Sequence, residues 1–132
     1  LTGTGPFDPP PSLAPHIHDL GFVDESEKHS AMAAATAFCH PSVNESLSIV
    51  ILESWLAGTP VLVHAGGNVM PDHCRRSNGG LWFRNYPEFE EALMLLLTQP
   101  DVRTRLAQNG RQYVLDRYGW DQVDERLFAA LA

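Results

Sequence analysis

The chain has 132 residues, of which 44% are hydrophobic and 19% are charged, and its formal net charge is −7. This is the composition of a globular domain and not of a disordered chain, and the length suffices for one domain with a hydrophobic core. The negative charge argues against nucleic acid as a partner, and no apolar run approaches the length of a membrane span.

The first third of the chain predicts one helix between short strands. Three segments precede this helix: the end of a strand and its glycine turn over residues 1–5, a proline-rich loop over residues 6–15, and a strand or its lead-in over residues 16–18. Asp24 and Glu27 have the spacing of a capping box, so we expect a helix over about residues 25–35. Residues 37–40 then predict a short strand that ends at Pro41.

Residues 41–60, PSVNESLSIVILESWLAGTP, predict a loop, one helix and a stop. Polar side chains at Asn44, Ser46 and Ser48 offer acceptors where the helix begins. Gly58 stands where a left-handed C-cap residue is favoured, and Pro60 prevents continuation of the helix.

The rest of the chain continues the alternation of strands and helices. The predicted elements are a strand over residues 61–63, a loop over 65–68, helix 69–76, strand 81–83, helix 87–97 behind a capping box at Asn85 and Glu88, helix 100–115 and helix 120–132. We expect the leucine-rich residues 93–97 to belong to the core. The alternation predicts an α/β fold, a Rossmann-like three-layer domain with a mainly parallel sheet flanked by helices.

Residues that follow predicted strands should meet at one edge of a parallel sheet, where such folds bind ligands. These residues are Gly3, Gly5, Phe22, His40, Pro41, His64 and Gly66. The start of the central helix belongs to the same edge. The pattern therefore predicts a ligand site there.

Two carboxylates mark the central helix, Glu45 near its start and Glu53 inside it. The neighbours of Glu53 on the helix surface are apolar, so this carboxylate needs either a structural partner, access to solvent or a ligand. A wholly helical path between the two residues would rise by about 12 Å, so the carboxylates would hold two ends of an extended molecule. Free N–H groups at Ser48, Ile49 and Val50 lie between them and form an anion site. A sugar, a diphosphate and a ribose in line fit this order.

The stretch PSVNESLSIVILESWLAGTPV resembles the E-x7-E region of retaining GT-B glycosyltransferases of the group 1 (family 4) type. The resemblance implies that Glu45 faces the hydroxyls of the donor sugar, that Glu53 faces the ribose hydroxyls, and that the backbone of Ser48 to Val50 faces the diphosphate. Two glycines of the family pattern stand here as Ser46 and Ser48. A serine still presents its N–H, although its side chain narrows the approach of a phosphate.

The resemblance extends over most of the chain. LTGTGP, with Gly3 and Gly5, is similar to a glycine turn of the family's C-terminal domain, and LGFV implies that Phe22 and Val23 face the nucleotide base. The segment after Gly67 departs from the family, which has P-E where this chain has NVMPD. A basic pair that meets the donor phosphates in the family does not precede Leu1.

Residues 1–132 are therefore expected to form part of a nucleotide-sugar-binding C-terminal domain, without its first strand and without the N-terminal acceptor domain. The implied activity is retaining glycosyl transfer to a glycan, lipid or small-molecule acceptor, and this piece alone should be inactive. The alternatives are a noncatalytic nucleotide-binding module and a GT-B sugar-nucleotide epimerase or phosphorylase. No D-x-D sequence occurs, so neither an essential metal nor a cofactor is indicated. We expect a cytoplasmic protein, with peripheral association at the inner face of the membrane left open.

The histidines and cysteines carry weaker signals. For His40 and His64 we favour backbone hydrogen bonds over contacts to a base or phosphate. For His73, which stands among Asp72, Arg75 and Arg76, we favour a solvated loop over an anion site. Cys39 is expected to be buried at a strand end and Cys74 to be ordinary, since the spacing of Cys39-His40 and His73-Cys74 is unusual for structural zinc and a disulfide is not favoured.

Overall fold

A computed structural model describes residues 8–119, 121, 122 and 129 of the chain. Its sheet has three parallel strands in the order β1-β2-β3: β1 (Phe38–His40), β2 (Val61–His64) and β3 (Gly80–Phe83). The carboxyl ends of the three strands therefore share one edge of the sheet, as the alternating sequence pattern predicts.

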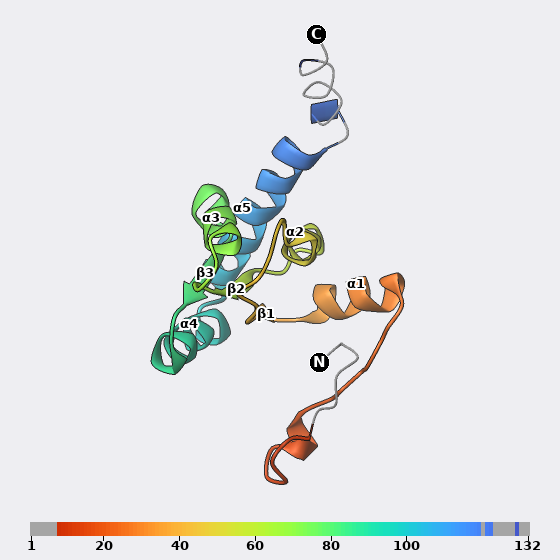
Figure 1. Cartoon of the computed structure of the whole chain (residues 1–132), viewed down its shortest axis with the longest axis vertical. Coiled ribbons are helices and arrows are strands. Elements are labelled where there is room, and N and C mark those ends of the chain that lie inside the picture. The colour runs from red at the N-terminus through yellow and green to blue at the C-terminus, as the bar shows by residue number, and fades with distance from the viewer. Residues whose placement is uncertain (1–7, 120, 123–128, 130–132) are drawn as a thin grey trace.

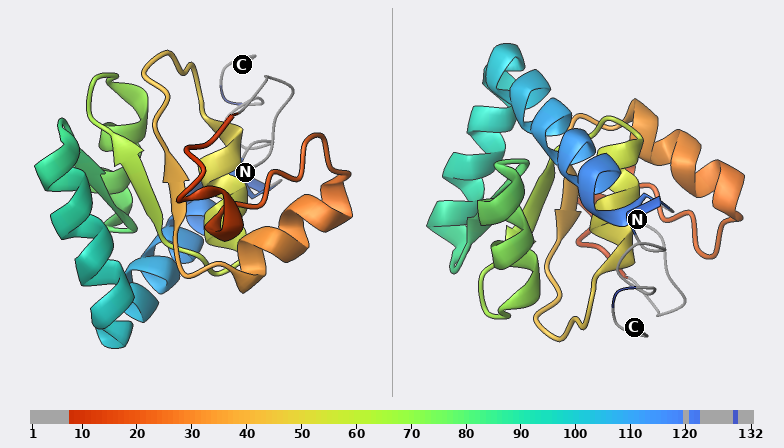
Figure 2. Two further views of the ribbon diagram at one scale, coloured as in Figure 1. Left: turned by 90° about the horizontal axis from the view of Figure 1, so that it is seen from below. Right: turned by 90° about the horizontal axis from the view of Figure 1, so that it is seen from above.

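The described residues include five α-helices, four of which pack against this sheet (Figures 1 and 2). They are α1 (Glu25–Ala34), α2 (Ile49–Leu56), α3 (Val69–Ser77), α4 (Tyr86–Thr98) and α5 (Pro100–Tyr118). Helix α5 packs against α2, α3 and α4, whereas α1 extends away from the sheet and contacts α2. The predicted α/β fold with a parallel sheet and flanking helices is confirmed.

The core lies where α2 and α5 meet over the central strand. Trp55 of α2 is wholly buried, and its Nε1 donates a hydrogen bond of 2.8 Å to the carbonyl oxygen of Gly79. Gly110 of α5 lies directly against the indole ring, because a Cβ on Gly110 would come within 2.3 Å of Trp55 Cδ1. A glycine is therefore required for α5 to approach α2 this closely.

Local signals at the helix ends have mixed outcomes. The capping box of Asp24 and Glu27 is present at α1, and Gly58 has the expected left-handed conformation with φ of 85°. At α4, the Asn85 side chain accepts from the Glu88 N–H, but the Glu88 carboxylate accepts from the N–H of Arg84 and not from that of Asn85. The second capping box is therefore only half formed.

Several expectations are wrong. A short 3-10 helix, η1 (Ala14–His16), begins with Pro15 in its first turn, and residues 17 and 18 lie in no strand, so the strand or lead-in expected at residues 16–18 is absent. Of the leucine-rich residues 93–97, only Leu96 is buried, since one helix can turn only one side to the core. Cys39 is exposed, not buried, and Cys74 is buried in α3; both thiols are free.

Parts of the prediction lie outside the described residues. These are the strand end with Gly3 and Gly5, and most of the helix expected over residues 120–132. Within the described residues, none of the helices combines the length and the apolar character that a membrane crossing requires.

Candidate functional site

The carboxyl end of β1, the loop over residues 41–48 and the start of α2 form the candidate site. His40 is the last residue of β1, and its Nε2 lies 3.0 Å from Glu45 Oε1. The expectation that His40 is satisfied by backbone is therefore wrong, because its ring contacts a carboxylate of the site. The hydrogen bond from His40 is the largest of the causes that hold the pKa of Glu45 below its ordinary value.

The loop reaches α2 through Ser48, which has a left-handed backbone with φ of 58° and ψ of 59°. Only 5% of Ser48 is exposed, and its hydroxyl has no hydrogen-bond partner among the described residues. The expected capping of α2 by a polar side chain is therefore absent in the described part of the chain.

Because no side chain caps α2, its first N–H groups are available. Within residues 8–119, the N–H groups of Ser48, Ile49 and Val50 donate to no acceptor, and the first bond of the turn runs from Ile51 N to Ser48 O at 3.1 Å. Unpaired N–H groups at a helix start carry partial positive charge and attract anions. Ile49 is 61% exposed, so a ligand can approach this end of the helix from solvent.

Glu53 lies about one turn after Ile49 in α2. Its carboxylate has a partner that the sequence did not reveal. The Lys28 ammonium of α1 lies 3.2 Å from Glu53 Oε1 and 3.1 Å from Oε2, and it also contacts Glu25 Oε2 at 2.7 Å. The Glu53 side chain keeps 21% of its surface exposed, and a cavity of about 410 Å³ between α1 and α2 opens beside it. The structural pairing considered above is thus realised, and the carboxylate remains accessible.

The pairing of Lys28 with Glu53 could have been inferred only by comparing the positions of the two residues on two separate predicted helices. Lys28 is the single lysine of the chain and lies one turn into the predicted helix 25–35. Glu25, His29 and Glu53 bring one ligand atom each within 4.8 Å of one another, a spacing that would suit a metal ion. The Lys28 ammonium already contacts both carboxylates there, so this cluster is a salt-bridged group in the structure.

The remaining predicted site residues occupy different positions. Phe22 is 87% exposed just before α1, Val23 beside it is half-buried, and Ser46 is exposed in the loop. His64 Nδ1 accepts from the N–H of Gly66 at 2.8 Å, which confirms a backbone partner for this histidine.

His73 is buried in α3, so the expected solvated loop is wrong. Its Nδ1 lies 2.9 Å from the Tyr113 hydroxyl of α5, and burial lowers the pKa of the imidazole. The neighbouring arginines have partners on the protein, since Arg76 pairs with Asp72 at 2.8 Å and Arg75 lies over the Trp82 ring. The polar and charged groups of this cluster therefore have partners on the protein itself.

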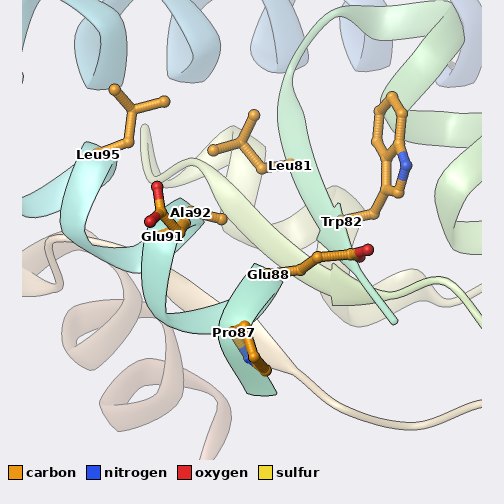
Figure 3. A pocket seen from close by; sticks show the side chains of 7 residues that line it. All are labelled: Leu81, Trp82, Pro87, Glu88, Glu91, Ala92 and Leu95. Carbon is orange, nitrogen blue, oxygen red and sulfur yellow. The ribbon is translucent and has the colours of Figure 1, made fainter. Parts of the chain in front are cut away.

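Another cavity lies between β3 and α4 (Figure 3). It has a volume of about 610 Å³, and its lining residues are Leu81, Trp82, Pro87, Glu88, Glu91, Ala92 and Leu95. Figure 3 shows that these side chains come from the β3 strand and from α4. Strand β3 is the edge strand opposite β1, so this hollow is separate from the candidate site.

Comparisons with known proteins agree with the fold. Residues 12–113 match the family described as glycosyl transferases group 1. An uncharacterized glycosyltransferase of Methanocaldococcus jannaschii is 30% identical over 108 residues, which are 79% of this chain and 27% of the relative. A phosphatidyl-myo-inositol mannosyltransferase of Mycobacterium leprae is 32% identical over 123 residues, which are 87% of this chain and 31% of the relative.

Solved structures show the same relationship. WaaG, a glycosyltransferase involved in lipopolysaccharide biosynthesis, superimposes with a TM-score of 0.67 at 28% identity over 77% of this chain and 28% of its own. Sucrose-phosphate synthase from Thermosynechococcus elongatus gives a TM-score of 0.74 at 25% identity over 90% of this chain and 32% of its own. The chain thus spans about a third or less of the length of each of these proteins. The extent of the family match shows that the chain belongs to the group 1 glycosyltransferases.

Proposed function

We propose that this chain is the donor-binding part of a retaining glycosyltransferase that uses a nucleotide-diphosphate sugar. The observation that carries the proposal is the start of α2, where the N–H groups of Ser48, Ile49 and Val50 have no acceptor within residues 8–119. Glu45 lies before these groups and Glu53 lies after them along the chain. This order fits the sugar, the diphosphate and the ribose of one extended ligand.

Each group has a role that follows from its chemistry. Glu45, held by His40, accepts from hydroxyls of the donor sugar, and Glu53 accepts from the ribose hydroxyls. The exposed Phe22 and the adjoining Val23 offer a surface for the base, and Ser46, Gly3 and Gly5 belong to the proposed donor contacts. Glu45 is assigned as a positioning carboxylate and not as a nucleophile, because the retaining glycosidase mechanism needs two carboxyls about 5 Å apart across the bond.

The chemical requirement of the reaction is to stabilise charge on the departing diphosphate. Preoriented N–H groups do this without reorganisation, but the dipole of one helix end contributes only about 0.3–2 kcal/mol. Cationic groups must supply the remainder. We assign them to the family's basic pair, which would precede residue 1, and this piece of the chain would then bind donor without turnover. No essential metal or cofactor is part of the proposal.

The proposed domain organisation follows from the same reasoning. Residues 1–132 would be part of a C-terminal donor domain, and among the described strands β1 pairs only with β2, so its outer edge can accept the domain's first strand. An N-terminal domain would hold the acceptor. The names of two relatives, a phosphatidyl-myo-inositol mannosyltransferase and a glycosyltransferase of lipopolysaccharide biosynthesis, favour a glycan or glycolipid acceptor. We also propose peripheral association with the inner face of the membrane.

The decisive test is nucleotide binding by the chain and by Glu53→Gln. Ligand-observed NMR with UDP-, GDP- and ADP-sugars should show saturation transfer from one nucleotide, and Glu53→Gln should weaken its binding about tenfold or more, because hydroxyls lose a charged acceptor. Glu91→Gln is the matched control, since Glu91 is an exposed acid on α4. Equal binding by the chain and by Glu53→Gln would contradict the proposed site.

A further inference from the structure

The single lysine of the chain joins two carboxylates from different helices. The three contacts of the Lys28 ammonium are with Glu25 Oε2 at 2.7 Å, Glu53 Oε2 at 3.1 Å and Glu53 Oε1 at 3.2 Å. The two oxygens of one carboxylate lie too close together to meet separate N–H groups of one ammonium, so Glu53 shares one N–H and Glu25 accepts from a second. Two of the three N–H donors of Lys28 are therefore committed to the carboxylates that it joins.

Glu53 keeps acceptor capacity in this arrangement. Each carboxylate oxygen has about two lone-pair positions, and Lys28 occupies one on each oxygen. The remaining positions are open to hydroxyl donors of a ligand, and His29 Nε2 lies 3.9 Å from Oε1 of the same carboxylate. Since both oxygens contact one ammonium, the carboxylate is restrained in rotation, and its acceptor directions are set before a ligand arrives.

We propose that Lys28 is a positioning residue, which orients the Glu53 carboxylate for the two vicinal hydroxyls of the donor ribose. This inference rests on the proposed function, because it assigns the same carboxylate to the ribose. It adds a residue that lies 25 positions upstream of Glu53 on another helix. The pairing also offsets repulsion between Glu25 and Glu53, which would otherwise push the two carboxylates apart.

A purely structural role for the pair is the competing explanation, in which Lys28 only fastens α1 to α2. The opposite end of α1 has its own attachment, since Met32 is buried and its carbonyl oxygen accepts from the Thr59 hydroxyl. A structural role predicts that loss of Lys28 affects every ligand of the site alike. A positioning role predicts an effect that depends on the ribose hydroxyls.

The test compares ribonucleotides with nucleotides that lack both hydroxyls. The chain and Lys28→Met are titrated with UDP, GDP and ADP, and the nucleotide that binds is compared with its 2′,3′-dideoxy analogue. We expect Lys28→Met to lower affinity for the ribonucleotide about tenfold and to change affinity for the dideoxy analogue less than about twofold. Lys28→Arg, which keeps a cation beside Glu53, should restore part of the loss.

NMR of the lysine side chain gives an independent readout. The chain has one lysine, so its ε-ammonium ¹⁵N signal needs no assignment by mutation. This signal should shift on addition of the ribonucleotide and remain in place with the dideoxy analogue. Glu25→Gln is the matched control, because the Glu25 side chain is 75% exposed and its loss leaves the contact between Lys28 and Glu53 in place.

The outcomes separate this inference from the proposed function. Loss of ribonucleotide binding in Glu53→Gln, with unchanged binding in Lys28→Met, overturns the role of Lys28 and leaves the donor site standing. An equal loss for both nucleotides in Lys28→Met also overturns it, in favour of the structural role. Failure of all three nucleotides to bind the folded chain overturns the proposed function and this inference together.

Discussion

Replacing Ser48 by glycine should stabilise the protein, although it removes a side chain from a buried position. Ser48 combines a left-handed backbone with a hydroxyl that has no hydrogen-bond partner in the described residues, and only 5% of the residue is exposed. The group 1 family pattern has a glycine at this place, as noted above. Ser48→Gly removes both unfavourable features and keeps the N–H that the proposed diphosphate site needs.

The magnitude follows from two stabilising contributions and one that opposes them. A left-handed conformation costs a residue with a Cβ about 1–2 kcal/mol. Glycine gives back about 0.5–1 kcal/mol of this, because it has greater freedom in the unfolded chain. Removal of the buried, unpaired hydroxyl adds a gain of about 1 kcal/mol. The free energy of unfolding should therefore rise by about 1–2.5 kcal/mol, which corresponds to an increase in Tm of about 3–10 °C.

Urea denaturation followed by tryptophan fluorescence measures this change, because one of the three tryptophans, Trp55, is wholly buried. Ser48→Ala is the matched variant, because it removes the hydroxyl but keeps the left-handed strain. Its stability should fall between that of the parent chain and that of Ser48→Gly. A glycine variant less stable than the parent would refute the reasoning. An alanine variant less stable than the parent, with a raised pKa for Glu45, would show that the hydroxyl bonds that carboxylate.

Two further predictions concern packing and pH. Gly110→Ala should lower the free energy of unfolding by about 1–3 kcal/mol, because the added methyl group overlaps the Trp55 ring. The same urea denaturation assay tests this prediction, with Gln108→Ala as the control on α5. An unchanged denaturation midpoint in Gly110→Ala would contradict the close approach of α5 to Trp55. The lowered pKa of Glu45 favours the folded state above its ordinary value of 4.5, and this contribution is lost as the pH falls through the lowered pKa. In His40→Ala the pKa of Glu45, measured by carboxyl ¹³C NMR, should rise toward 4.5; an unchanged value would show that His40 is not the main cause.

The local elements were predictable where a short-range signal acts alone. The capping box at Asp24, the stop at Gly58 and the alternation of strands with helices all depend on residues within a few positions of one another. The predicted start of the central helix was correct for the same reason, since Ile49 begins its apolar run. Its cap was not, because the Ser48 backbone turned to the left-handed region and its side chain was carried away from the N–H groups.

Burial was less predictable, because it depends on what packs against each face. The leucines of α4 look alike in sequence, but only Leu96 meets a neighbouring element on all sides. His73 stands in a polar run, yet α5 brings the Tyr113 hydroxyl to its ring from 40 positions away. No local pattern carries that information.

The sequence by itself determined the α/β class, the family and the order of Glu45, the helix start and Glu53 along the chain. These depend on periodicity and spacing, which are properties of neighbouring residues. Only the tertiary structure decided the partners of the two carboxylates, His40 for one and Lys28 for the other. The reason is physical: a charge in a half-buried position is stabilised by groups that the packing of separate elements brings within hydrogen-bond distance, and that packing is not written in any one segment.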